Sequence, residues 1–168
     1  MTSTLNNRQL GELEFENGYA GTHVTVGGRT VELDVYFEEG EPNPEALDRL
    51  AAILSNLELL EEHARSAIKE NLAEDGAESA LRQCRQYQFD ELEPATLQRL
   101  FGTESAAGLT DDRHLAAFAL THIGVHPEHE DAAVNCDFRV GPEAEAPHMI
   151  SVMFDAEGHA EDVSLEHH

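Results

Sequence analysis

Apolar and polar residues alternate at both ends of this chain, whereas in its middle apolar residues recur at every third or fourth position. Alternation with a period of two is typical of a strand with one buried face, and the longer period is typical of an amphipathic helix. The pattern therefore predicts strands, then helices, then strands. Elements segregated in this order favour the α+β class over a wound parallel sheet.

Turn signals separate the strands of the first third. Residues 12–16 alternate acidic and apolar side chains, and Asn17-Gly18 follows as a turn. Gly27-Gly28 separates segment 23–26 from segment 30–37, and paired glycines tolerate the positive φ angles of tight hairpin turns. We expect a half-buried antiparallel sheet here. The apolar side of its last strand comprises Val31, Leu33, Val35 and Phe37.

A leucine stripe marks the middle of the chain, and Asn43 is a candidate helix N-cap in front of it. A single helix over residues 44–73 would be about 45 Å long, which exceeds a compact domain of this size. We therefore place a break near residues 55–56. Shorter helices are predicted over residues 77–87 and 94–101.

The last third returns to alternation. A short helical turn over residues 111–116 precedes a strand ending at Val125, and further strands are predicted over residues 134–140, 150–154 and 159–164. Four consecutive strands with short turns form an antiparallel meander. The two terminal groups of strands can join one sheet with the helices on one face, and two smaller sheets are the alternative.

The length of the chain indicates the number of domains, and its two cysteines indicate whether a disulfide is expected. A chain of 168 residues fits one domain, which we assign to residues 1–164. Residues 165–168, Leu-Glu-His-His, resemble the remnant of an expression tag. Cys84 and Cys136 lie far apart and in no motif, so we expect buried, reduced thiols, with a disulfide as the alternative.

Acidic residues far outnumber basic ones: 34 Asp and Glu face 10 Lys and Arg, for a net charge of −24. Such a surface repels nucleic acid and anionic lipid, and it favours cationic partners or divalent cations. With no long apolar segment and no signal-peptide pattern, we expect a cytoplasmic protein that binds neither membrane nor nucleic acid. Adaptation to high salt and a GC-rich genome are alternative sources of this composition.

Four motifs carry a family resemblance. They are Leu10-Gly11-Glu12-Leu13, the run Leu120-Thr121-His122-Ile123-Gly124-Val125-His126-Pro127-Glu128 with Asp131, the pair Asp137-Phe138, and residues 150–155 closed by Gly158. In these motifs the chain resembles a family of bacterial proteins classified only as a domain of unknown function. The resemblance implies a bacterial source and an α+β fold. It implies no activity, because that family brings no catalytic residues with it.

Three neighbouring histidines are candidate metal ligands. His122 and His126 are four residues apart on a predicted strand and would share one face, while His129 follows Pro127 in a loop. The sequence predicts no cofactor outright, but imidazoles backed by carboxylates can bind Zn²⁺ or another divalent transition metal. A solvated strand face and a pH-sensitive surface are the alternatives.

The strand after these histidines brings a second polar group. If segment 134–140 pairs antiparallel with the preceding strand, Asn135 and Asp137 approach His122. A His–Asp pair beside an amide is one arrangement for a general base. A polar cross-strand pair without catalytic function is the alternative, and the sequence assigns no catalytic residue.

An acidic hairpin is the candidate partner-binding surface. Its carboxylates can project from one sheet face and attract a basic protein partner over long range. Ca²⁺ is a weaker alternative, because the EF-hand loop spacing is absent. We therefore hypothesise an interaction module, by analogy with bacterial immunity proteins against basic toxins, and a metal-dependent enzyme centred on the histidines is the alternative. The candidate partner-binding residues are Glu12, Glu14, Glu16, Glu32 and Asp34.

Overall fold

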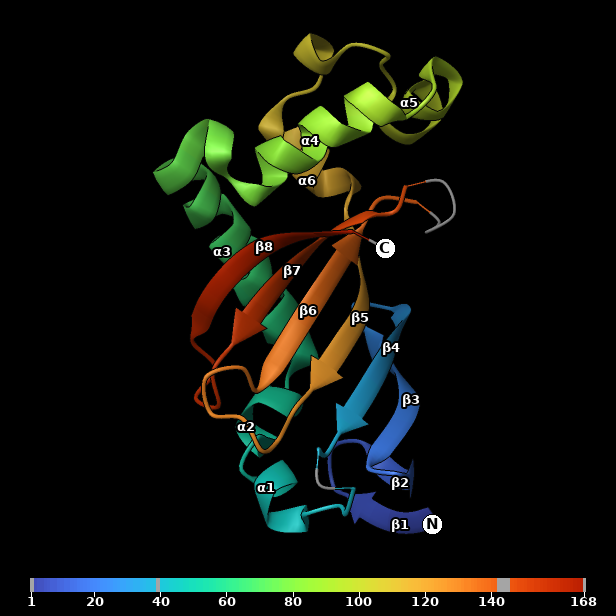
Figure 1. The fold of residues 1–168 in the computed structure, drawn as a ribbon, viewed down its shortest axis with the longest axis vertical. Helices are drawn as coiled ribbons and strands as arrows, with labels where there is room; N and C mark the ends of the chain where they lie inside the picture. The colour runs from blue at the N-terminus through green and yellow to red at the C-terminus, as the bar shows by residue number, and fades with distance from the viewer. Residues whose placement is uncertain (1, 39, 142–145, 168) are drawn as a thin grey trace.

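The computed structural model describes residues 2–38, 40–141 and 146–167, and it contains one eight-stranded sheet in the order β1 to β8 (Figure 1). The strands are β1 (Thr2–Asn7), β2 (Gly11–Glu16), β3 (Tyr19–Val26), β4 (Arg29–Tyr36), β5 (Ala119–Val125), β6 (Val134–Arg139), β7 (His148–Phe154) and β8 (Ala160–His167). The helices are α1 (Pro44–Asp48), α2 (Ala51–Leu54), α3 (Leu57–Asp75), α4 (Ala80–Glu91), α5 (Pro94–Phe101) and α6 (Asp111–Ala117), with 3₁₀ turns η1 (Gly76–Glu78) and η2 (Ala106–Gly108).

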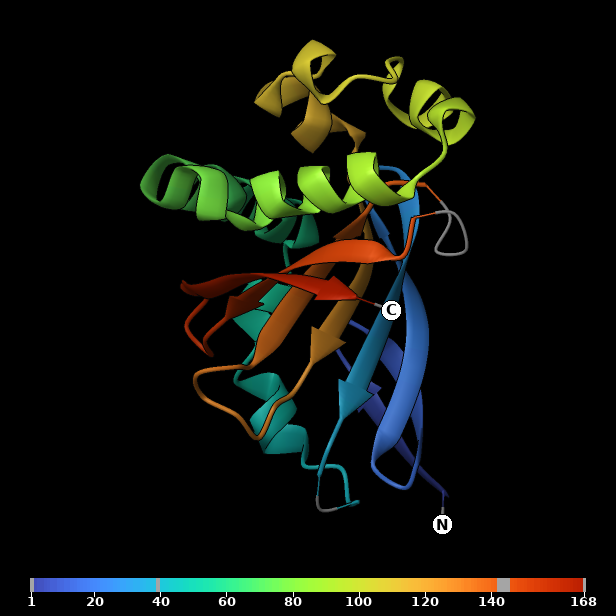
Figure 2. The same ribbon diagram turned by 45° about the horizontal axis from the view of Figure 1, so that its top comes forward.

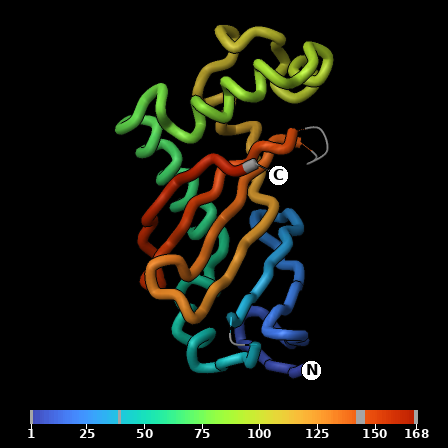
Figure 3. Tube along the Cα trace, viewed as in Figure 1, coloured from blue at the N-terminus to red at the C-terminus, as the bar shows by residue number. Residues whose placement is uncertain are grey.

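The α+β class is confirmed, and the strands of both ends join one sheet. The expectation of an antiparallel sheet is wrong at one junction, because β4 and β5 pair in parallel from Glu32↔His122 to Val35↔Val125. Figure 3 shows the reason: the chain leaves β4 at the lower end, climbs the back of the sheet through α1 to α3, and descends again in β5. A crossover of this kind joins parallel strands.

Helix α3 covers one face of the sheet, and it begins where the sequence predicts a break. Asn56 is its N-cap and accepts a hydrogen bond from the backbone N–H of Leu59 at 3.1 Å. Leu60, Ala64 and Ile68 on α3 are buried against the apolar side of the strands. Figure 1 shows α2 and α3 behind the sheet, whereas no helix lies in front of β4 to β7. The polar side of these strands is therefore an open face.

A helical cap of α4, α5 and α6 closes the upper end of the molecule (Figure 2). His114 on α6 is fully buried there, and its Nε2 lies 2.8 Å from Oε1 of Gln88 on α4. The rings of Phe101 and Phe118 contact the imidazole edge to face. Burial lowers the pKa of His114 to about 3, and the positive charge of Arg85 acts in the same direction. His114 is therefore a neutral core histidine.

Two further features of the fold bear on the predictions. Cys84 and Cys136 are both buried and free, as expected, and burial raises the pKa of Cys84 to about 12. Strand β8 continues through the tail residues, since Leu165 pairs with Ile150 of β7. Within the described ranges, every helix is too short or too polar to cross a membrane.

Candidate functional site

Four strands bring a polar cluster together at the centre of the open face. The hydroxyl of Tyr19 on β3 donates to Oδ1 of Asp34 on β4 at 2.6 Å. The other oxygen of Asp34 lies 2.6 Å from Nε2 of His122 on β5. On the far side of the ring, Nδ1 of His122 lies 2.8 Å from Oδ2 of Asp137 on β6. The imidazole of His122 thus bridges two carboxylates across β4, β5 and β6.

The geometry requires His122 to carry a positive charge. Ionised carboxylates only accept hydrogen bonds, so both ring nitrogens of His122 must donate. The hydrogen bond with Asp137 raises the pKa of His122 to about 9, with a further contribution from Asp34, although partial burial opposes the shift. Burial would raise the pKa of Asp137, but hydrogen bonds from His122, Ser151 and Asn135 lower it. Asp34, His122 and Asp137 therefore share a net charge near −1 at neutral pH.

The hydrogen-bond chain continues from Asp137 to a second histidine. The amide nitrogen of Asn135 donates to Oδ1 of Asp137 at 3.1 Å, so the amide oxygen of Asn135 is left as an acceptor. Nε2 of His126 lies 3.2 Å from that oxygen and must be the donor. In a neutral His126 ring this contact places the proton on Nε2 and leaves the lone pair on Nδ1.

A glycine makes room for this arrangement. Gly124 pairs with Asn135 across β5 and β6. A Cβ atom at position 124 would overlap the Asn135 side-chain oxygen. A larger residue at position 124 would therefore push the Asn135 amide away from its contacts with Asp137 and His126.

The three predicted metal ligands do not converge on one point. Both ring nitrogens of His122 are engaged by carboxylates, and Nε2 of His129 lies 2.9 Å from Oε1 of Glu38. The rings of His126 and His129 stand perpendicular, with centroids 6.2 Å apart. Among the described residues, the one group of three ligand-type side chains within 4.8 Å of one another is Asp155, Glu157 and His159. Metal binding by His122, His126 and His129 stays a prediction.

The five predicted partner-binding acids fall into two sets. Glu32 and Asp34 lie on the open face, and Asp34 is already bonded to Tyr19 and His122. The other set lies on β2, which pairs with β3 only at Glu16↔Tyr19. Beyond that point the β1–β2 hairpin turns behind β3 and β4 (Figure 2). Glu12 and Glu14 are exposed on the turned hairpin, away from Asp34, and partner binding by the five acids stays a prediction.

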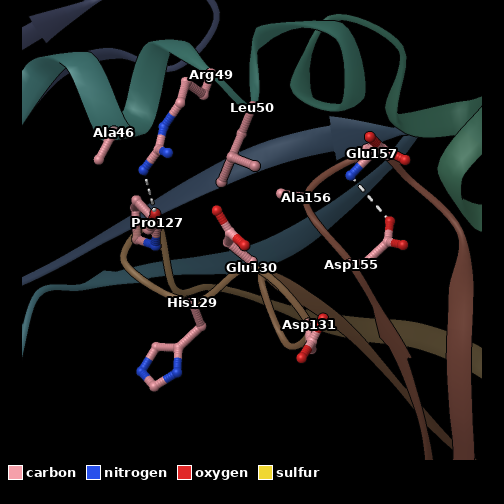
Figure 4. Close-up of a pocket in the computed structure, with 10 residues that line it drawn as sticks. All are labelled: Ala46, Arg49, Leu50, Pro127, His129, Glu130, Asp131, Asp155, Ala156 and Glu157. Atoms are coloured by element: carbon pink, nitrogen blue, oxygen red, sulfur yellow. Dashed lines mark hydrogen bonds between the residues drawn. The ribbon is translucent and has the colours of Figure 1, made fainter.

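A pocket of about 300 Å³ lies below the open face, between α1 and the loops that follow β5 and β7 (Figure 4). Arg49 reaches from the end of α1 toward the carbonyl oxygen of Pro127 at 3.4 Å. Backbone N–H groups of His159 and Glu157 hold the pKa of Asp155 below its usual range. Four of the ten residues that line the pocket are acidic, namely Glu130, Asp131, Asp155 and Glu157, and His129 lies beside them.

Sequence reasoning missed Tyr19 and the link from Asp34 to His122. The only local signals are Gly21 and Gly124, two glycines inside strands, which often mark a close approach of side chains. A Cβ at Gly21 would lie 3.1 Å from both the Asp34 carboxylate and the Tyr19 hydroxyl. No protein-family model, curated protein or solved structure matches the chain.

Proposed function

We propose that this protein is an interaction module that binds a basic protein partner. The observation that supports it is the scarcity of Lys and Arg among the described residues of the open face. Among the described outward positions of β4 to β8 there are five carboxylates, whereas the one Lys or Arg is Arg139 and the one charged histidine is His122. The carboxylates are Glu32, Asp34, Asp137, Asp162 and Glu166. Most of the basic residues lie instead on or beside the helices, namely Arg49, Arg65, Lys69, Arg82, Arg85, Arg99 and Arg113.

The acids differ in their availability to a partner. Asp34 and Asp137 are committed to His122, whereas Glu12, Glu14 and Glu16 are exposed and form no ion pair among the described residues. A cationic partner gains most from carboxylates that have no internal counter-charge. The β2 acids are therefore the main attracting groups, and Glu32 on the open face, which lies 4.0 Å from His23, is a further one.

The test uses a defined probe and two variants of equal charge. We expect wild-type protein to bind a fluorescein-labelled peptide of alternating arginine and threonine, with affinity that falls steeply as salt rises. The triple variant E12Q/E14Q/E16Q should bind about tenfold more weakly, the equivalent of roughly 1.4 kcal/mol.

The matched control is E70Q/E74Q/E78Q, which removes the same charge from exposed positions of α3 and η1. It should bind as the wild type does. If both triple variants lose affinity equally, only net charge is involved and the binding surface is not the one proposed. Absence of measurable binding by wild-type protein at low salt would refute the proposal.

A transition-metal site is the second candidate function. It is favoured by the lone pair that the Asn135 contact leaves on Nδ1 of His126, and by the perpendicular ring of His129 nearby. We expect Zn²⁺ to raise the melting temperature of the tag-free protein. His126→Ala should abolish this shift, and His63→Ala, at an exposed position of α3, should leave it unchanged.

A further inference from the structure

The outer edge of β3 is an open strand edge. Strand β3 pairs with β4 along all of its residues, from Tyr19↔Tyr36 to Val26↔Arg29. On its other side β2 pairs with it only at Glu16↔Tyr19, and the β1–β2 hairpin then turns away. In Figures 1 and 2 the upper part of β3 forms the border of the sheet.

The register identifies the backbone groups at this edge. Phe37 donates its N–H to the carbonyl of Gly18 at 2.7 Å, which marks that pair as hydrogen-bonded. Hydrogen-bonded and non-hydrogen-bonded pairs alternate along an antiparallel ladder. Gly21, His23 and Thr25 therefore direct their N–H and C=O groups away from β4. Among the described residues, no strand pairing beyond Glu16↔Tyr19 is formed on this side of β3.

Carboxylates frame this edge. Glu16 lies at its lower end, opposite Tyr19, and Glu32 lies across from His23 on β4. At the upper end a carboxylate oxygen of Glu58 accepts the N–H of Gly27 at 3.2 Å. Proteins often protect exposed edges with lysine or proline, and β3 contains neither. A second copy of this chain is disfavoured as the occupant, because each copy carries a net charge of −24.

We propose that β3 accepts an extended basic segment of a partner protein by strand addition, an inference that rests on the proposed function. The partner backbone pairs with Gly21, His23 and Thr25 and supplies most of the affinity. Alternate side chains of the added strand point to one side of the sheet. Those on the open-face side reach Glu16 and Glu32, and arginine fits best because its guanidinium binds carboxylates through two hydrogen bonds.

The experiment compares two peptides of equal charge. In the first, the threonine peptide, arginine alternates with threonine; the second has the same sequence with every backbone nitrogen methylated, so that it has no N–H to donate to β3 in either strand direction. Wild-type protein should bind the threonine peptide at least about tenfold more tightly. His23→Pro should remove this preference, because it deletes an outward N–H without touching the pairing with β4. The control Thr30→Pro removes an N–H on β4 that faces away from β3 and should retain the preference.

Amide hydrogen exchange tests the proposal on the wild-type protein, so the result does not depend on whether a proline variant folds. In wild-type protein the amides of Gly21, His23 and Thr25 should become protected when the threonine peptide binds. Equal binding of both peptides, or unchanged exchange at these three amides, would overturn strand addition while leaving an electrostatic interaction module intact. Failure to bind either peptide would count against the proposed function itself. Dimerisation of the protein without peptide would assign the edge to a second copy and overturn the inference.

Discussion

Two histidines in different regions of this molecule differ in charge at neutral pH: one is positively charged and the other is neutral. On the open face, His122 is 28% exposed and donates to the two carboxylates of Asp34 and Asp137. In the helical cap, His114 is fully buried and meets only the neutral amide of Gln88 through Nε2. Burial disfavours the charged form at both sites, yet it prevails only where no carboxylate faces the ring. The partner of a histidine therefore decides its charge more than its depth does.

The comparison has opposite consequences for stability at the two ends of the pH scale. The folded pKa of His114 lies below its ordinary value of 6.5, so the unfolded chain binds the proton more tightly and stability falls as the pH drops. The folded pKa of His122 lies above 6.5, so the folded chain holds that proton more tightly and stability falls as the pH rises.

The largest expected change in the free energy of unfolding occurs at acid pH. Below pH 6.5 and down to about 3, the wild-type protein should lose on the order of 1.4 kcal/mol of unfolding free energy per pH unit on account of His114. His114→Gln should lack this part of the slope, as measured by urea denaturation at a series of pH values. His63→Gln on the exposed side of α3 is the control and should keep the wild-type slope. Identical slopes for wild type and His114→Gln would refute the neutral assignment.

The second-largest effect is the loss of unfolding free energy when one of the two carboxylates that contact His122 is removed. Asp137 is 8% exposed, whereas Asp34 is 31% exposed. Asp137→Asn should therefore cost about 3 kcal/mol of unfolding free energy, and Asp34→Asn about 1 kcal/mol, because solvent screens the more exposed pair. Chemical denaturation at neutral pH measures both. Equal losses would mean that burial does not distinguish the two contacts.

The smallest effect is at alkaline pH. The contribution of His122 is fully present below about pH 6.5 and is lost as the pH rises through about 9. Because the ring is partly exposed, we expect a loss of roughly 1 to 2 kcal/mol. His122→Gln should flatten the stability profile over this range. A wild-type profile that is already flat there would show that the imidazolium contributes nothing to folding.

The sequence predicted the part of the cluster that lies within one antiparallel pair. His122 and Asp137 face each other because β5 and β6 pair antiparallel in the register that begins at Val125↔Val134. Asp34 could not be predicted, since it lies 88 residues from His122 and meets it across the parallel junction, whose register no local pattern encodes. Helix α5 was predicted to the residue, because Pro94 and Gly102 mark its ends locally.

The N-terminal hairpin shows where the sequence pattern is insufficient. Alternation in β2 correctly predicts that Leu13 and Phe15 are buried. It does not reveal that Phe15 packs on Phe37, with ring centroids 5.5 Å apart, which draws the hairpin behind the main sheet. Strand β1 was missed because Leu5 is the only apolar side chain among its residues. Tertiary packing, and not local propensity, sets the position of this hairpin.

The parallel junction between β4 and β5 also bears on how the chain folds. Each hairpin on either side closes a short loop and can form within microseconds, whereas this junction must wait until the intervening helices bring its two strands together. We therefore expect the salt bridge from Asp34 to His122 to form after the folding transition state. Its loss should then accelerate unfolding while leaving the folding rate almost unchanged.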